Sequence, residues 1–209
     1  MLKRELEAKF GAVESIEKDG ETFFLFSISA LKDCRVLMTS DLHLYSMNNA
    51  ESTKHKFLEL YFELPSYWSE KDLEDSENSW VFSILSRLKN HVVEKNTWFG
   101  DGHTMRANEK NKSIASNMKQ NYLMLSEPIH LSEYLKGFSI GAQNIEFLAI
   151  IPIFRQEFQY KQAYGTDKLR EVFEEREVTE RLDGFRQNLV KSRWRRAVSY
   201  THLTLPTSF

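Results

Sequence analysis

The pattern of apolar and polar residues predicts an amphipathic helix over residues 80–95. Its apolar positions recur at steps of three and four, which places them on one helical face: Val81, Ile84, Leu85, Leu88 and Val92. Asn78 and Ser79 stand directly before the helix as candidate N-caps, because a short polar side chain can accept a hydrogen bond from a first-turn amide. After Lys95 the periodicity ends, and the segment 96–104, NTWFGDGHT, has the glycine content of a tightly turned loop.

Aromatic and aliphatic runs on both sides of this helix predict the strands of a sheet. We expect strands at residues 22–29, 35–39, 57–64, 122–125 and 145–154, with the first two paired as a hairpin. In the third of these, FLELYFEL, apolar residues alternate with Glu59 and Glu63, and this alternation predicts one solvent-exposed face. The last segment is the most apolar of the chain, so it is expected at the centre of the sheet. Pro152 indicates that it leaves the ladder near its end.

Shorter helices and two polar connections complete the predicted organisation. Helices are expected at residues 2–10, 156–164 and 167–175, and Gly165 with Thr166 forms the break between the last two. Residues 66–78 are predicted to form a linker that contains an acidic run. Residues 106–120 are almost wholly polar, and we expect an exposed excursion that contributes nothing to the core.

The size and charge of the chain limit its function classes. A chain of 209 residues with 41% hydrophobic and 13% aromatic residues can bury a substantial core, and we expect one domain over residues 1–190. The formal net charge is -2, from 28 basic and 30 acidic residues, which gives no electrostatic reason to expect nucleic acid or an anionic membrane as the partner.

The single cysteine and the N-terminal sequence indicate in which cellular compartment the protein is expected. Cys34 cannot form an internal disulfide, and its apolar neighbours favour a buried structural thiol over a nucleophile. The N-terminal sequence MLKRELEAKF lacks the apolar run of a signal peptide, and no later segment is long enough to span a bilayer. We therefore expect a reducing, cytoplasmic environment.

The last residues are set apart by their composition. Residues 197–207, AVSYTHLTLPT, resemble the translation of a sequencing adapter, so we expect residues 197–209 to be an artefact and the natural sequence to be cut at about Arg196. The basic run 191–196 is then a truncated end, for which a solvated segment and a binding patch are the two interpretations. Adapter sequence of this kind favours a bacterial or metagenomic source.

The order of several landmarks along the chain resembles the suppressor of fused family. These landmarks are VLMTS (36–40), FLELYFELPSYW (57–68), Trp80 with its helix, NTWFGDGHT (96–104), IIPIF (150–154), EFQYK (157–161) and LDGFRQN (182–188). The most specific are ELPSYW, the NTWFGDGHT loop and the proline strand followed by EFQYK. Two positions depart from the family pattern: Asp41 stands where many bacterial relatives have glycine, and Gly184 stands where they have proline.

The resemblance implies an α+β domain that binds other proteins and is not an enzyme. It implies a mixed, mostly antiparallel sheet with helices packed on it. Animal relatives hold a transcription factor of the Hedgehog pathway through a short peptide added to a sheet edge, whereas similar bacterial domains are often encoded beside polymorphic toxins and are thought to act as immunity proteins. We therefore expect a bacterial immunity protein that neutralises a toxin by direct binding. The alternative is a regulatory adaptor that captures a short peptide by edge-strand addition.

Six residues are candidate partner contacts, and each has a structural alternative. They are Tyr67, Trp68, Trp98, Phe99, Asp101 and His103. The aromatic residues could anchor an interface or fill the core. His103 could be a metal ligand or a general base, but no second histidine stands at ligand spacing, which favours a hydrogen-bonded structural role. An enzyme centred on His103, Asp101 and Asp41 is the third hypothesis. We expect no cofactor and no metal.

Overall fold

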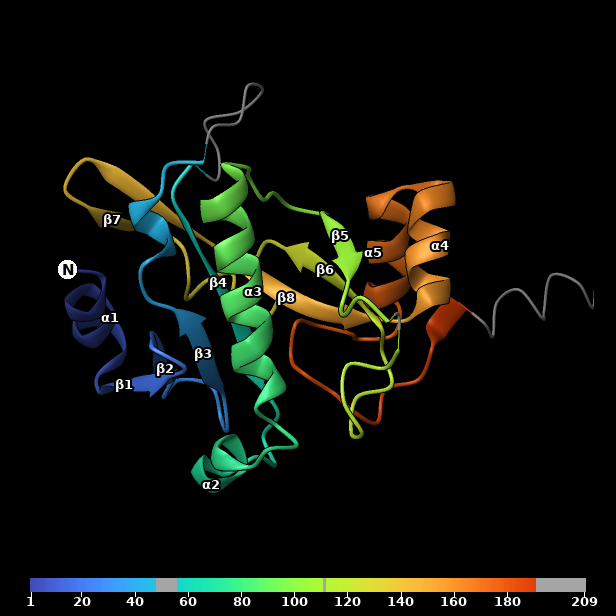
Figure 1. Cartoon of the computed structure of the whole chain (residues 1–209), viewed down its shortest axis with the longest axis horizontal. Coiled ribbons are helices and arrows are strands. Elements are labelled where there is room, and N and C mark those ends of the chain that lie inside the picture. Colours follow the sequence, from blue (N-terminus) through green and yellow to red (C-terminus); the bar gives the residue numbers. More distant parts are fainter. Residues whose placement is uncertain (48–55, 111, 191–209) are drawn as a thin grey trace, which may run out of the picture.

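The fold is a twisted sheet with helices on both faces (Figure 1). The computed structural model describes residues 1–47, 56–110 and 112–190. The described strands are β1 (Val13–Lys18), β2 (Glu21–Ser27), β3 (Arg35–Thr39), β4 (Leu58–Leu64), β5 (Thr104–Arg106), β6 (Tyr122–Ser126), β7 (Phe138–Ile140) and β8 (Gln143–Ile153). The described helices are α1 (Leu2–Phe10), α2 (Glu70–Glu74), α3 (Trp80–Lys95), α4 (Arg155–Tyr164) and α5 (Thr166–Glu174), with a short 3-10 turn at Leu42–Leu44.

The strands lie in the order β1-β2-β3-β4-β8-β6-β5, and β7 pairs with β8 beside this path. All the described pairings are antiparallel except that of β4 with β8, which is parallel. The mixed, mostly antiparallel sheet of an α+β fold is therefore confirmed. The strand predicted at the centre is β8, which lies between β4 and β6, and Pro152 stands one residue before its end.

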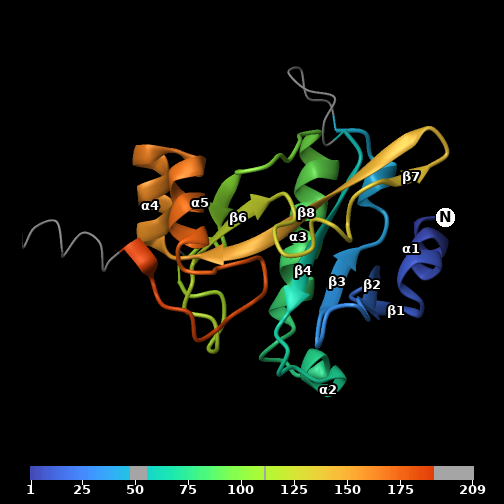
Figure 2. The same ribbon diagram turned by 180° about the vertical axis from the view of Figure 1, so that it is seen from behind.

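Two hydrophobic clusters fill the space between the sheet and its helices. On one face, α3 packs over β4 and β8, with Leu85 and Leu88 of the helix in the same cluster as Leu148 and Ile150. On the other face, α1 and α5 cover the sheet, and Phe147 and other residues of β8 join this second cluster (Figure 2). Because successive side chains of a strand point to opposite faces, β8 is apolar throughout its buried part.

The predicted central helix begins and ends where expected, but its first turn is not capped as expected. The helix ends at Lys95, and its C-cap Asn96 has a left-handed backbone at φ 46°. Neither predicted N-cap side chain caps the first turn. The Ser79 hydroxyl donates to the Ser76 carbonyl at 2.9 Å, and the Asn78 amide donates to the Asp72 carbonyl at 2.8 Å. Both side chains thus bind carbonyl groups of the segment that precedes α3.

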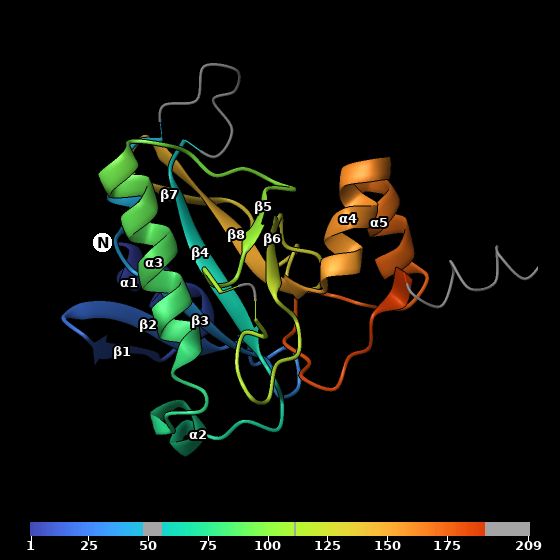
Figure 3. The same ribbon diagram turned by 45° about the vertical axis from the view of Figure 1, so that its right-hand side comes forward.

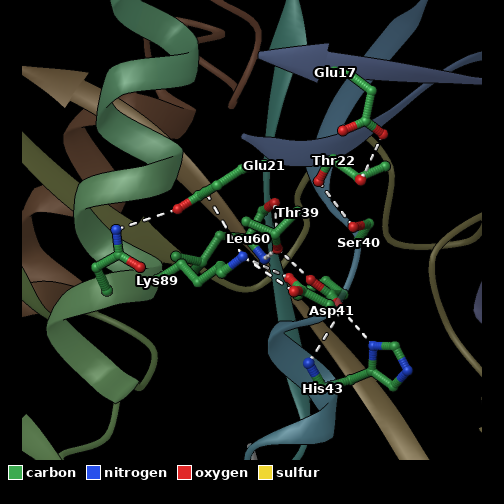
Figure 4. Close-up of polar contacts among 11 residues, drawn as sticks. Glu17, Glu21, Thr22, Thr39, Ser40, Asp41, His43, Leu60 and Lys89 are labelled. Atoms are coloured by element: carbon green, nitrogen blue, oxygen red, sulfur yellow. Dashed lines mark hydrogen bonds and ion pairs between the residues drawn. The ribbon is translucent and has the colours of Figure 1, made fainter. Parts of the chain in front are cut away.

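The prediction of an exposed face on β4 is wrong, because Glu59 and Glu63 are both 0% exposed. The Glu59 carboxylate accepts a hydrogen bond from the Thr39 hydroxyl and another from the His43 amide at 3.1 Å, and its Oε1 lies 2.5 Å from His43 Nδ1. In the same region Lys89 of α3 extends to Asp41, at 2.9 Å (Figure 4). The sheet is thus joined to the loop after β3 by polar contacts that lie under α3.

Glu63 has an equivalent role at the other end of β4. Its Oε1 accepts a hydrogen bond from Arg181 Nε at 2.6 Å and lies 3.0 Å from His130 Nδ1. The Glu63 carbonyl also accepts a hydrogen bond from the Leu182 amide at 2.9 Å, and a parallel bridge joins Glu63 to Arg181. The closing segment of the fold is therefore held directly against β4.

Other differences concern segments with weak patterns. The polar stretch 106–120 does contribute to the core, because Ala107 and Met118 are 6% and 2% exposed. The predicted linker 66–78 contains α2, and the short strands β1, β5 and β7 were not predicted. No helix within the described ranges combines the length and the apolar character that a bilayer crossing requires. The basic run 191–196 and the adapter-like segment 197–209 lie outside the described residues.

Replacing Glu59 with alanine is expected to lower the free energy of unfolding by roughly 3–5 kcal/mol, because it leaves the buried partners of a charged group unpaired. The matched control is Glu17→Ala on β1, whose carboxylate is exposed and accepts a hydrogen bond from Thr22; it should cost no more than about 0.5 kcal/mol. Urea-induced unfolding followed by tryptophan fluorescence measures both. Equal losses for the two variants would show that Glu59 does not hold the loop.

Cys34 is expected to be unreactive in the folded protein. Burial, followed by the charge of Glu63, raises the pKa of its thiol to about 12, and the residue is 2% exposed. At pH 8, Ellman's reagent should therefore label the native chain slower than the urea-unfolded chain by on the order of a hundredfold or more. Because the unfolded thiol ionises near 9.0 and the folded one near 12, this group stabilises the fold below pH 9, and the contribution is lost as the pH rises to 12. Fast native labelling would contradict the burial of the thiol.

Candidate binding site at the sheet edge

The NTWFGDGHT loop leads from α3 into β5, the last strand of the sheet. In Figures 1 and 3, β5 lies between α3 on one side and the α4–α5 pair on the other. A hollow of about 650 Å³ opens here. It is lined by residues of α3, of the loop, of β5 and of α4: Arg87, Leu88, His91, Thr97, Trp98, Phe99, Gly102, His103, Thr104, Met105 and Lys161. The loop predicted to carry function therefore forms a wall of a concave site.

Aromatic contacts fix the shape of this loop. The Trp98 ring lies 4.4 Å from the His103 ring, and the Phe99 ring stacks on His91 of α3 with centroids 6.0 Å apart. Phe99 is 5% exposed, and its amide donates to the Met47 sulfur at 3.4 Å. Phe99 thus anchors the loop to the core. Trp98 and His103 line the hollow together with Thr97, Phe99 and Gly102 of the loop.

The Asp101 carboxylate connects the loop to α5 and to the segment that follows β6. Its Oδ1 accepts hydrogen bonds from Arg170 of α5 and, at 2.9 Å, from the Glu127 amide. Gly102 follows with φ +77°, and a Cβ built on it would lie 2.9 Å from the Thr166 hydroxyl. Only glycine combines this left-handed backbone with so close an approach to the start of α5. The loop is therefore fixed to both helical layers.

Lys161 of α4 forms the opposite wall of the hollow. Its ammonium donates to the Thr104 hydroxyl at 3.4 Å, across the face of β5 turned away from α3. Burial lowers the pKa of Lys161, and the nearby charge of Arg170 lowers it further, while Asp101 acts in the opposite direction. Arg87, on the α3 side, donates to the Ala107 carbonyl at 2.9 Å. The two cationic side chains thus stand on either side of the sheet edge.

The outer edge of β5 offers main-chain groups for binding. The Leu125 amide donates to the His103 carbonyl at 2.8 Å, and the Ala107 amide donates to the Asn121 carbonyl at 3.0 Å. Residues 103, 105 and 107 therefore face β6, and by the alternation of an antiparallel ladder the N–H and C=O groups of Thr104 and Arg106 point away from it. The edge carries an open row of hydrogen-bonding groups beside the hollow.

Tyr67 lies elsewhere, on a second hollow of about 580 Å³ between the end of β4 and the closing segment. Its ring is 56% exposed and lies 5.7 Å from that of Phe185, which is 82% exposed. Burial raises the pKa of the Tyr67 hydroxyl. Trp68, the neighbouring candidate, is 7% exposed and packs edge-on against Trp80, so it fills the core. The structure therefore does not bring the six candidates into one site.

The enzyme hypothesis finds no support in this geometry. His103 lines the first hollow, but neither Asp101 nor Asp41 is among the described residues that do so. The carboxylate of Asp101 is bound to Arg170, and that of Asp41 to Lys89. In the described part of the chain, no three side chains of histidine, cysteine, aspartate or glutamate converge as metal ligands would.

A sequence comparison identifies the fold that presents this site. The family described as suppressor of fused protein (SUFU) matches residues 23–187. The chain belongs to the suppressor of fused family. A comparison with curated proteins finds no match.

Solved structures share the fold of this suppressor of fused protein at low sequence identity. A suppressor of fused homologue from Neisseria gonorrhoeae has a TM-score of 0.58 and 14% identity, over 88% of this chain and 81% of that chain. The Sufu protein in a crystal structure of the Sufu-Fu complex has a TM-score of 0.62 and 11% identity, over 98% and 94%. Drosophila Suppressor of Fused has a TM-score of 0.54 and 11% identity over 86% of this chain, which spans only 45% of that protein.

Three of the six candidate contacts, Trp98, Phe99 and His103, line the hollow, whereas no residue of its α4 wall was predicted. Lys161 stands in the EFQYK landmark, which carried the family resemblance and was not considered as part of a site. The open edge of β5 had no sequence signal, because its three residues, TMR, are too few to show alternation.

Replacing Gly102 with alanine is expected to lower the free energy of unfolding by about 1–3 kcal/mol more than the same change at Gly141. Both glycines have positive φ, +77° and +60°, but a Cβ at Gly141 has no atom within 4 Å. The comparison therefore isolates the contact with Thr166 from the backbone strain. Thermal unfolding of the two variants measures the difference, and equal losses would mean that the close approach to α5 is not stabilising.

Proposed function

We propose that this chain is a non-enzymatic binding domain that takes up an extended segment of another protein as an added strand on β5. The observation that carries the proposal is the open edge of β5 beside a hollow that can receive side chains. Strand addition combines both features, because main-chain hydrogen bonds supply affinity and pockets beside the edge supply specificity. The Sufu-Fu complex supports the proposal, since a relative with this fold is found in a complex.

The other terminal strand is a poorer docking edge. β1 carries exposed charged residues, including Glu14 and Glu17, and Lys3 of α1 donates to the Ser15 hydroxyl at 2.9 Å. Charged residues on an edge strand disfavour pairing with another chain, and β1 carries Glu14, Glu17 and Lys18 where β5 carries only Arg106. β5 is short, but Thr104 and Arg106 together can offer about four main-chain hydrogen bonds, one donor and one acceptor from each residue.

The finer proposal concerns the partner. We propose that the captured segment belongs to a bacterial toxin, so that the chain acts as an immunity protein, with regulatory capture of a peptide as the alternative. The similar fold of the Neisseria gonorrhoeae protein supports a bacterial setting for this domain. Co-expression with the product of the neighbouring gene distinguishes the two, because only an immunity protein restores growth to cells that make a toxin.

Strand capture is tested by Arg106→Pro, which removes an outward amide and leaves the hydrogen bonds to β6 in place. Nonapeptides displayed on phage are selected on the wild-type chain, and those that bind are measured on the variants. We expect Arg106→Pro to weaken binding by about tenfold or more, because main-chain bonds are lost and the edge is blocked. Arg106→Ala, which keeps the amide, is the control and should bind within about twofold of wild type.

Unfolding curves establish that Arg106→Pro retains the fold. Equal binding by the proline and alanine variants would contradict strand addition at β5. Failure to select any peptide on the wild-type chain would remove the proposal itself.

A further inference from the structure

The hollow beside β5 has an unbalanced charge. Its lining contains the cationic side chains of Arg87 and Lys161 and two histidines, His91 and His103, but no aspartate or glutamate is among the described residues that form it. The nearest acidic group of the loop, Asp101, is bound to Arg170 behind the wall. A bound segment that entered this hollow would therefore meet positive charge on both sides.

Of the two cationic side chains in the lining, Lys161 has the longer hydrogen bond in the free protein, 3.4 Å to the Thr104 hydroxyl, compared with 2.9 Å from Arg87 to the Ala107 carbonyl. Among the described residues, the Lys161 ammonium makes this one hydrogen bond. Burial lowers its pKa and the charge of Arg170 lowers it further, while the charge of Asp101 raises it. Burial and the charge of Arg170 thus disfavour the charged ammonium in the free protein. An anion at the sheet edge would add a countercharge within direct reach of Lys161, in a partly buried position where such pairs are worth more than on an open surface.

The alternation of an added strand determines which of its side chains reaches Lys161. A strand bound along β5 would lie about 4.8 Å from it, with successive side chains on opposite faces of the sheet. Met105 packs against the cluster under α3, whereas Thr104 contacts Lys161 on the opposite face. One side chain of the bound segment would therefore point to Lys161, and its neighbours would point to Met105 and Phe99 on the α3 side.

We propose that the segment captured on β5 carries an aspartate or glutamate whose carboxylate pairs with Lys161, flanked by an apolar residue that enters the α3 side of the hollow. This specificity rests on the proposed strand capture and adds to it the chemistry of the partner. The acidic group supplies the charge that the lining lacks. The apolar neighbour meets Leu88, Phe99 and Met105, which form the floor on that side.

The phage-displayed nonapeptides selected on the full chain test this specificity. We expect an acidic residue next to an apolar one to be enriched, and Lys161→Gln to weaken these peptides by about tenfold. The control is Lys168→Gln on α5, an exposed lysine that pairs with Glu171 at 2.7 Å; it should leave binding unchanged. Lys161→Glu should recover binding to a peptide in which the acidic residue is replaced by lysine.

The outcomes separate this inference from the proposed function. Peptides that depend on the Arg106 amide but show no acidic preference, and bind Lys161→Gln as tightly as wild type, would overturn the inference and leave strand capture standing. If no peptide is selected, both fall. A phosphoserine peptide that binds more tightly than its glutamate counterpart would assign the site to phosphate and overturn the carboxylate assignment.

Discussion

The burial of β8 on both faces is the constraint on which the rest of the structure depends. An apolar strand in this position needs cover on each side, and a domain supplies it by packing one layer of helices on each face of the sheet. Here α3 covers one face, and α1 and α5 cover the other. Where the two layers reach the end of the sheet, they leave β5 exposed between them, so that the candidate binding edge is a consequence of how the core is covered.

Buried carboxylates perform a second task, which is to hold irregular segments against this core. Glu59 binds the turn after β3, and Glu63 binds the closing segment. Glu180 accepts hydrogen bonds from the amides of residues 129–131, and Glu157 pairs with Arg186 at 2.6 Å. Because each charge is desolvated, its partners must all be in place for the fold to be stable. These contacts fix the turn after β3, residues 129–131 and the closing segment to the sheet and its helices.

The sequence was informative where one physical signal dominated. The period of α3, the apolar run of β8 and the Gly165 break predicted these elements correctly, whereas the fold class followed from the resemblance to the suppressor of fused family. The alternation in β4 was misread, because glutamates that bind buried partners have the same spacing as glutamates that face water. Trp98, Phe99 and His103 were found through composition. Lys161 was not predicted as part of a site, because no local pattern in the sequence shows that α4 lies beside the edge of β5, opposite α3.

The parallel pairing of β4 with β8 sets an order on the assembly of the molecule. The strands from β1 to β4 are consecutive neighbours, so they can associate through local contacts as soon as they leave the ribosome. β8 follows only after α3 and the loops beyond it, and closing so large a loop is slow. Until β8 arrives, the inner edge of β4 has no partner. While β8 is still being synthesised, this edge of β4 has unpaired main-chain groups. Such an edge can pair with other chains, so the incomplete sheet is prone to aggregation at this point of synthesis.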